Sequence, residues 1–258
     1  MRETKAHAIF IIRYMDAIFE VNYAGIPLRY QFLKKQTAPY FGRNIRLTKV
    51  DAYDIKMNEK EFQFFRDIHP EGITDAYVEY KGLIYLTSEK LLTEKCCIFH
   101  AVSFYWKNKA WLITGKSGIG KTTQYMNWTH LYPNEITMIS GDMPLLDFRE
   151  DKICVHPSPW NGKEGIKSTI SAELGGIVIL NQADYNTIEQ AEMFDSIPIL
   201  YHQFPIIPRK EKDIHLIAGM VQRTIEEIPI WILSNDGSED STRMLRETLL
   251  KQLEEKRI

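Results

Sequence analysis

The segment "AWLITGKSGIGKTT", from Ala110 to Thr123, constrains the fold most, because an apolar run leads directly into a glycine-rich loop. The eight residues from Gly115 to Thr122 fit the phosphate-loop (Walker A) pattern G-x-x-x-x-G-K-[ST] without a mismatch. Such a loop needs a strand before it and a helix after it, and "KTTQYMNWTHL" has helical spacing. The sequence therefore predicts a nucleotide-binding loop; the alternative is a strand-to-helix turn that binds nothing.

Each residue type in this loop has a physical task. The glycines let the backbone approach a polyphosphate, and the exposed N–H groups form an anion nest with the start of the helix. Lys121 can reach the β and γ oxygens, and the Thr122 hydroxyl can hold Mg²⁺. We therefore expect ATP and Mg²⁺ as ligands. The predicted nucleotide-binding residues are Gly115, Lys116, Ser117, Gly118, Ile119, Gly120, Lys121, Thr122 and Thr123.

Composition excludes several classes of protein. The 258 residues are 44% hydrophobic and 26% charged, as is typical of a folded globular protein. The net charge of -2 gives no global basic field for nucleic acid or an anionic membrane. Three cysteines, no signal-peptide pattern and no long apolar run favour a cytoplasmic protein without disulfides. We expect neither a nucleic-acid nor a membrane partner; the oligomeric state stays open, a homo-oligomer included.

We expect a β-rich amino-terminal lobe, residues 1–95, packed on a second part that contains the glycine loop, residues 96–258. In the lobe, alternating stretches predict short strands, and one segment from Asn58 to Ile68 predicts a helix. The predicted strands are "AIFEVNY", "IPLRYQF", "AYVEY" and "LIYLTS".

The second part is expected to be mixed α/β. Two β-rich runs around the polar turn "KNK" predict a hairpin that leads into the glycine loop. Further strands are predicted at "EITMIS", "GGIVILN" and "IPIWILS", a short helix near Asn186 to Met193, and a final helix from about Glu239.

Three polar residues are candidates for chemistry beside the loop. Asp142 ends the apolar run "ITMISGD", where such an enzyme needs a carboxylate for the metal or for orienting the nucleophile. The alternative is that Asp142 only closes a turn. Asp147 could play the same role, but it lies in a more apolar run. His100 lies at the end of a predicted strand, where a histidine can be a functional residue or an ordinary packed or surface residue.

The segments "FHAVSFYWKNKAWLITGKSGIGKTT" and "MISGDMPLLDF" together resemble the HPr kinase-like group of phosphate-loop kinases, whose fold is related to that of phosphoenolpyruvate carboxykinase. The resemblance covers about residues 96–200 and implies an α/β (α+β, mixed-sheet) catalytic domain. It also implies that His100 lies near the phosphates and that Asp142 is a base, a metal ligand or both. The family usually has two adjacent aspartates here, whereas this chain has Gly141 and Asp142.

The segment "SPWNGKEG", Ser158 to Gly165, looks like that of kinases encoded beside lasso peptides and other ribosomally made, modified peptides (RiPPs). Trp160 could stack on a base or acceptor, and Lys163 could contact phosphoryl oxygens. Arg209 in "PIIPRKEKD" could do the same. The alternatives are an ordinary surface loop with a packed tryptophan for the first segment, and a solvated loop for the second.

These expectations describe a kinase that moves the γ-phosphate of ATP to a serine hydroxyl. Lys121, Lys163 and Arg209 would offset the developing charge, while Asp142 or His100 orients the hydroxyl and takes its proton. The expected acceptor is a serine on a precursor peptide or small protein. A small-molecule hydroxyl kinase and an ATP-binding switch without an acceptor are the alternatives.

Overall fold

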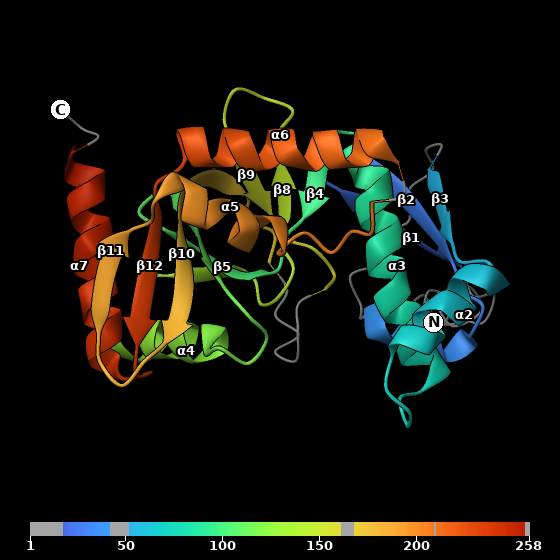
Figure 1. The fold of residues 1–258 in the computed structure, drawn as a ribbon, viewed down its shortest axis with the longest axis horizontal. Coiled ribbons are helices and arrows are strands. Elements are labelled where there is room, and N and C mark those ends of the chain that lie inside the picture. The colour runs from blue at the N-terminus through green and yellow to red at the C-terminus, as the bar shows by residue number, and fades with distance from the viewer. Residues whose placement is uncertain (1–17, 42–51, 161–167, 209, 256–258) are drawn as a thin grey trace, which may run out of the picture. The chain divides into compact units, whose positions relative to one another are not determined.

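The structure, a computed structural model, describes residues 18–41, 52–160, 168–208 and 210–255. These residues form two compact units, coloured along the chain in Figure 1. The first comprises the described residues up to Glu94 together with Pro205–Pro208. The second comprises the described residues from Lys95 to Phe204 and from Lys210 onward.

The first unit is a three-stranded sheet with three helices. Its elements are β1 (Ile18–Tyr23), β2 (Ile26–Gln31), the 3-10 helix η1 (Lys35–Phe41), β3 (Tyr53–Lys56), α2 (Glu59–Ile68) and α3 (Asp75–Leu92). Strand β2 pairs antiparallel with β1 and parallel with β3. The fully buried Glu79 of α3 accepts hydrogen bonds from the backbone N–H groups of Leu33 (2.5 Å) and Lys34 (2.9 Å) and from the Thr37 hydroxyl (2.6 Å). This carboxylate therefore satisfies two donors just before η1 and one within it, and ties this segment to α3.

Strands β1 and β2 and helix α2 confirm the sequence predictions, and Asn58 closes α2 with a capping box. The prediction of strands at "AYVEY" and "LIYLTS" is wrong, because both segments lie inside α3. Thr74 caps this helix, and its buried residues recur three and four positions apart, for example Leu83, Thr87 and Leu91. Burial along one helical face therefore prevails over the strand propensity of the tyrosines and isoleucines.

The second unit contains a mixed nine-stranded sheet among the described residues, so the predicted mixed α/β fold class is confirmed. Its main path runs in the order β4-β8-β9-β10-β6-β5-β7; β12 pairs with β10 and β11 with β12. The strands are β4 (Cys96–Ile98), β5 (Ala101–Trp106), β6 (Lys109–Thr114), β7 (Thr137–Ser140), β8 (Leu145–Asp147), β9 (Cys154–His156), β10 (Ala172–Gln182), β11 (Thr187–Gln190) and β12 (Ile230–Asn235).

Three parallel strands form the centre of this sheet. Strand β10 lies between β6 and β12, with Ile113 opposite Val178 and Val178 opposite Trp231. Near-continuous apolar runs suit strands that are covered on both faces. The arrowheads of β10 and β12 in Figure 1 point to the end of the sheet where α4 lies. The carboxyl ends of these strands therefore meet at the edge where α/β proteins bind ligands.

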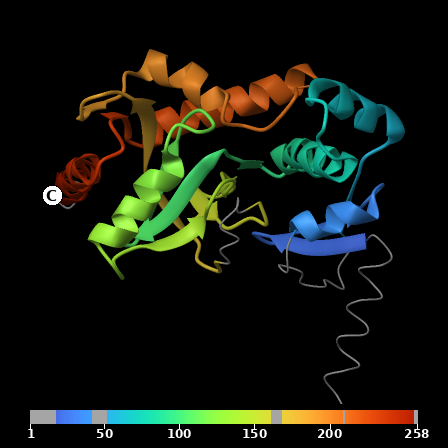
Figure 2. The ribbon, with the colours of Figure 1, turned by 90° about the horizontal axis from the view of Figure 1, so that it is seen from below.

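Four helices belong to this unit: α4 (Lys121–Leu131), α5 (Met193–Tyr201), α6 (Glu211–Glu227) and α7 (Glu239–Glu255). Figure 2 shows α7 end-on beside α4. Both helices contribute to one apolar cluster with the sheet, whose buried members include Phe104, Trp106, Trp111, Trp128, Val178, Leu245 and Leu249. The helix that follows the glycine loop is thus held on a dense aromatic core.

Several predictions in this unit are corrected by the structure. The segment near Asn186 to Met193 is not a helix: β11 occupies Thr187–Gln190, and α5 begins at Met193. The charges that suggested a solvated loop after Arg209 are the first turn of α6, and the short strands β8 and β9 were not predicted. Among the described residues, no helix is long and apolar enough to cross a membrane.

Candidate nucleotide and phosphoryl-transfer site

The hairpin β5–β6 carries the glycine loop, as the sequence predicts. Its two-residue turn has Lys107 and Asn108 at φ 50° and 64°, the left-handed conformation that suits the twist of a hairpin. Strand β6 ends at Thr114, and α4 begins at Lys121 with Gly120 at its N-cap. The loop therefore joins a buried strand to a helix amino end, which is the context that its sequence pattern requires.

Three glycines of the loop have backbone angles that other residues rarely adopt. The φ angles are 141° at Gly115, 79° at Gly118 and 108° at Gly120. At Gly115, an added Cβ would also lie 3.1 Å from the backbone oxygen of Leu180 and 3.2 Å from Cγ2 of Ile119. The loop thus needs glycine at Gly115 for both space and conformation, which makes it a backbone cradle that fits a polyphosphate.

Lys121 closes over this loop. Its Nζ donates to the backbone oxygens of Gly115 (3.1 Å) and Lys116 (3.2 Å), and the residue is buried. Burial lowers the pKa of the Lys121 ammonium, and the negative charge of Asp142 opposes this effect. The negative charge of Asp142 thus favours the ammonium form of Lys121.

Asp142 and His100 lie close together, as the resemblance to the HPr kinase-like group implies. His100 Nε2 lies 3.5 Å from Asp142 Oδ1, and the two side chains are 23% and 31% exposed. The backbone fixes both residues: the N–H of Ala101 donates to the oxygen of Asp142 (2.8 Å), and the Thr114 hydroxyl donates to the oxygen of His100 (2.7 Å). The last residue of the loop strand therefore holds the histidine beside the carboxylate.

Trp160 is packed rather than presented to a ligand. Its side chain is 1% exposed, and its backbone oxygen accepts from the N–H of Met143 (3.1 Å). The hydroxyl of Ser158 donates to the oxygen of Met143 and accepts from the N–H of Trp160. This favours the packed tryptophan over the predicted stacking on a base or acceptor. Lys163 and Arg209, the other predicted phosphate contacts, lie outside the described residues.

Asp147 belongs to a different group of side chains. It ends β8, is buried, and accepts from Arg149 Nε (2.9 Å) and Nη2 (2.5 Å). Burial alone would raise the pKa of this carboxyl, but hydrogen bonds and charge from Arg149 outweigh it, so the pKa is lowered. Asp147 is therefore an ionised partner of Arg149.

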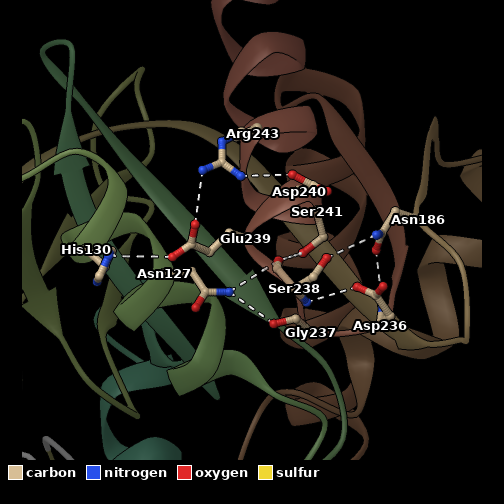
Figure 3. Close-up of polar contacts among 10 residues, drawn as sticks. All are labelled: Asn127, His130, Asn186, Asp236, Gly237, Ser238, Glu239, Asp240, Ser241 and Arg243. Atoms are coloured by element: carbon tan, nitrogen blue, oxygen red, sulfur yellow. Dashed lines mark hydrogen bonds and ion pairs between the residues drawn. The ribbon is translucent and has the colours of Figure 1, made fainter.

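Sequence reasoning missed a polar loop beside α4, shown in Figure 3. The amide of Asn127 on α4 donates to the backbone oxygens of Gly237 (3.1 Å) and Ser238 (3.3 Å), and Asn186 donates to the Ser238 hydroxyl (3.2 Å). His130 on α4 lies 3.6 Å from Glu239, the first residue of α7. The sequence predicts only a helix cap in this loop. The loop follows β12, which is parallel to β10 and ends at Asn235, and this strand order is the signal that places the loop at the same edge of the sheet as the glycine loop.

Thr122 and Asp142 have oxygen donors of the kind that Mg²⁺ prefers. Within the parts of the chain that the structure covers, no group of three or more His, Cys, Asp or Glu side chains could hold a metal by itself. Mg²⁺ in kinases is usually held by one or two protein oxygens and by phosphate oxygens. Thr122, directly after Lys121, and Asp142 are the residues that would hold it.

No protein-family model matches the chain, and no curated protein matches it. Among solved structures, the chain is similar to the HPr(Ser) kinase/phosphatase from Coxiella burnetii, with a TM-score of 0.34 and 13% sequence identity. That match covers 62% of this chain and 91% of the other.

Proposed function

We propose that the second unit is an ATP-dependent kinase that transfers the γ-phosphate to a serine hydroxyl. The observation that carries the proposal is the pair of Asp142 and His100, held 3.5 Å apart and within electrostatic reach of Lys121. A phosphate loop alone supports nucleotide binding, whereas a carboxylate and an imidazole beside it supply groups for an acceptor hydroxyl.

The loop would bind the phosphates through its backbone. The N–H groups from Gly115 to Gly120 and the start of α4 provide fixed dipoles for anionic oxygens. Lys121 would exchange its bonds to the loop carbonyls for bonds to the phosphate oxygens and offset the charge of the transferring group. Mg²⁺, held by Thr122 and Asp142, would neutralise charge on the phosphate oxygens.

The acceptor hydroxyl would be oriented by Asp142 and His100. Both side chains are partly exposed, so a hydroxyl can reach them from solvent. The carboxylate would accept the hydroxyl proton as the bond from the hydroxyl oxygen to the γ-phosphorus forms and the bond to the leaving ADP oxygen breaks. The imidazole would keep the carboxylate in place. Backbone hydrogen bonds hold both residues, so the pair is preorganised for this role.

The proposed acceptor is a serine of a precursor peptide of the lasso or RiPP type, or of a small protein. This part of the proposal is supported only by the sequence resemblance described above. In keeping with it, we place the enzyme in the cytoplasm, with residues 1–95 as a separate lobe.

The proposal is tested by incubating the full chain with ATP, Mg²⁺ and serine-containing candidate peptides, and by reading the intact mass of each peptide. We expect the addition of one phosphate group, and a loss of rate of roughly a hundredfold or more in Lys121→Ala and in Asp142→Asn. Lys251→Ala, an exposed lysine on α7, and Asp151→Asn, an exposed acid in a turn, are the matched controls.

The outcomes separate the alternatives. Phosphate on a serine that depends on Lys121 and Asp142 supports the kinase. Hydrolysis or consumption of ATP without peptide modification would support a kinase for a small hydroxylated acceptor. ATP binding without ATP consumption and without peptide modification would support a switch. Absence of ATP binding would refute all three.

A further inference from the structure

A second group of reactive side chains lies on β8, β9 and the start of β10. Within the sheet, β9 pairs antiparallel with β8, and Val155 pairs with Ala172 of β10. This pairing places Ser171, directly before β10, beside His156. The hydroxyl of Ser171 lies 2.8 Å from His156 Nδ1, and His156 Nε2 lies 3.5 Å from Asp147 Oδ2. None of these residues is used by the proposed kinase.

The charges fix the proton on the imidazole. Asp147 is ionised because Arg149 stabilises its negative charge, and an ionised carboxylate can only accept. The ionised carboxylate of Asp147, 3.5 Å from Nε2, therefore favours the tautomer with the proton on Nε2, which leaves the lone pair of Nδ1 toward Ser171. Burial lowers the pKa of His156, so the imidazole is neutral at neutral pH and able to take a proton.

The exposure of the three side chains decreases from Ser171 through His156 to Asp147, which is the order expected for a nucleophile, its base and a supporting carboxylate. Ser171 is exposed, the His156 side chain is 19% exposed and that of Asp147 is 9% exposed. A hydroxyl at the surface, a half-buried base and a buried carboxylate behind it form the general pattern of an activated serine.

We propose that Ser171 is a nucleophile activated by His156, with Asp147 as a positioning residue, and that this site takes carboxylic esters as acyl donors. The Ser171 oxygen attacks the ester carbonyl carbon, and His156 Nδ1 takes the hydroxyl proton. The bond to the alkoxy group then breaks, and that group leaves as an alcohol with the same proton. Water hydrolyses the acyl-serine, which releases the carboxylic acid and restores the Ser171 hydroxyl.

The test uses the full chain without any nucleotide, so its outcome is independent of the kinase proposal. The protein is treated with a fluorophosphonate, which forms a P–O bond to an activated serine and loses fluoride, and the adduct is mapped by peptide mass spectrometry. We expect the adduct at Ser171 and its loss in Ser171→Ala. In His156→Gln, we expect the rate of labelling to fall by roughly 10²-fold or more. Hydrolysis of p-nitrophenyl acetate should decline in parallel.

Ser168→Ala is the matched control, because Ser168 lies on the same segment and its hydroxyl accepts from the N–H of Ile170 rather than facing a histidine. Labelling should be unchanged in this variant. An unlabelled Ser171, or a folded His156→Gln protein labelled at the rate of the unmodified chain, overturns the proposal.

A second pair of variants covers the case in which His156→Gln fails to fold. Ser171→Cys should react with iodoacetamide faster than Ser168→Cys, because only position 171 has a base beside it; equal rates overturn the proposal. The positioning role of Asp147 is tested separately. If Asp147 orients the imidazole, long-range ¹⁵N spectra should show the Nε2–H tautomer of His156. The Nδ1–H tautomer would contradict it.

Discussion

Two alanine substitutions in the glycine loop separate conformational strain from lack of space. At Gly118 an added Cβ meets nothing within 4 Å, so Gly118→Ala costs only the strain of a φ of 79°. That strain is about 1–2 kcal/mol. At Gly115 a φ of 141° is combined with the backbone oxygen of Leu180 at 3.1 Å. This oxygen belongs to β10 and cannot move without the strand, so about 1–3 kcal/mol of overpacking adds to about 1–2 kcal/mol of strain.

Gly115→Ala should therefore lower the free energy of unfolding by about 2–5 kcal/mol, and Gly118→Ala by about 1–2 kcal/mol. For a domain of this size, each kcal/mol corresponds to a fall in Tm of about 2–4 °C. Urea unfolding and thermal scans measure both values, and ATP titration of each folded variant measures the effect on the loop. Equal stabilities of the two variants would refute the steric reading of Gly115.

Three further changes have outcomes set by single contacts. Thr114→Val removes the hydroxyl that holds His100; we expect a loss of about 1 kcal/mol in stability and a fall in kcat larger than any rise in KM, restored by Thr114→Ser. Asp147→Asn should be less stable than the unmodified chain at neutral pH. Because folding lowers the Asp147 pKa, this difference is full above the unfolded value of 3.8 and disappears as pH falls through the folded value, as unfolding at several pH values would show. Gly176→Ala places a methyl group 2.6 and 2.8 Å from two buried tryptophan rings, and should cost about 1–3 kcal/mol in urea unfolding.

The elements with local signals could be predicted from the sequence. The hairpin before the loop has two β-rich apolar runs and a polar two-residue turn, and the loop and α4 follow from glycine spacing. Helix α3 could not be predicted in this way, because its tyrosines and isoleucines favour strands and only tertiary burial selects the helix. Helix α6 was missed because its first turn is charged and its buried positions, such as Asp213 and Ile217, appear only once it packs.

The site shows the same division between local and long-range information. The sequence identifies Lys121 and Thr122, since their spacing from the glycines is fixed. The pairing of Asp142 with His100 was expected from resemblance, and its physical basis is the contact between Ala101 and Asp142, which needs the register of β5 and β7. The hydrogen bond between His156 and Ser171 joins residues 15 apart through the pairing of β9 and β10, which no local pattern predicts.

The order of the parallel strands has a consequence for synthesis on the ribosome. Strand β6, which carries the loop, gains its second neighbour only when β10 has been made. The carboxyl-terminal part of β10, from Ile177 to Gln182, gains its second neighbour from β12 near the end of the chain. Leu245 and Leu249 of α7 then complete the apolar cluster under α4. Since such long-range pairing forms late and slowly, the nascent chain should acquire affinity for nucleotide only after α7 has emerged. A chain truncated before Ile230 would have every residue of the loop and still lack the support that shapes it.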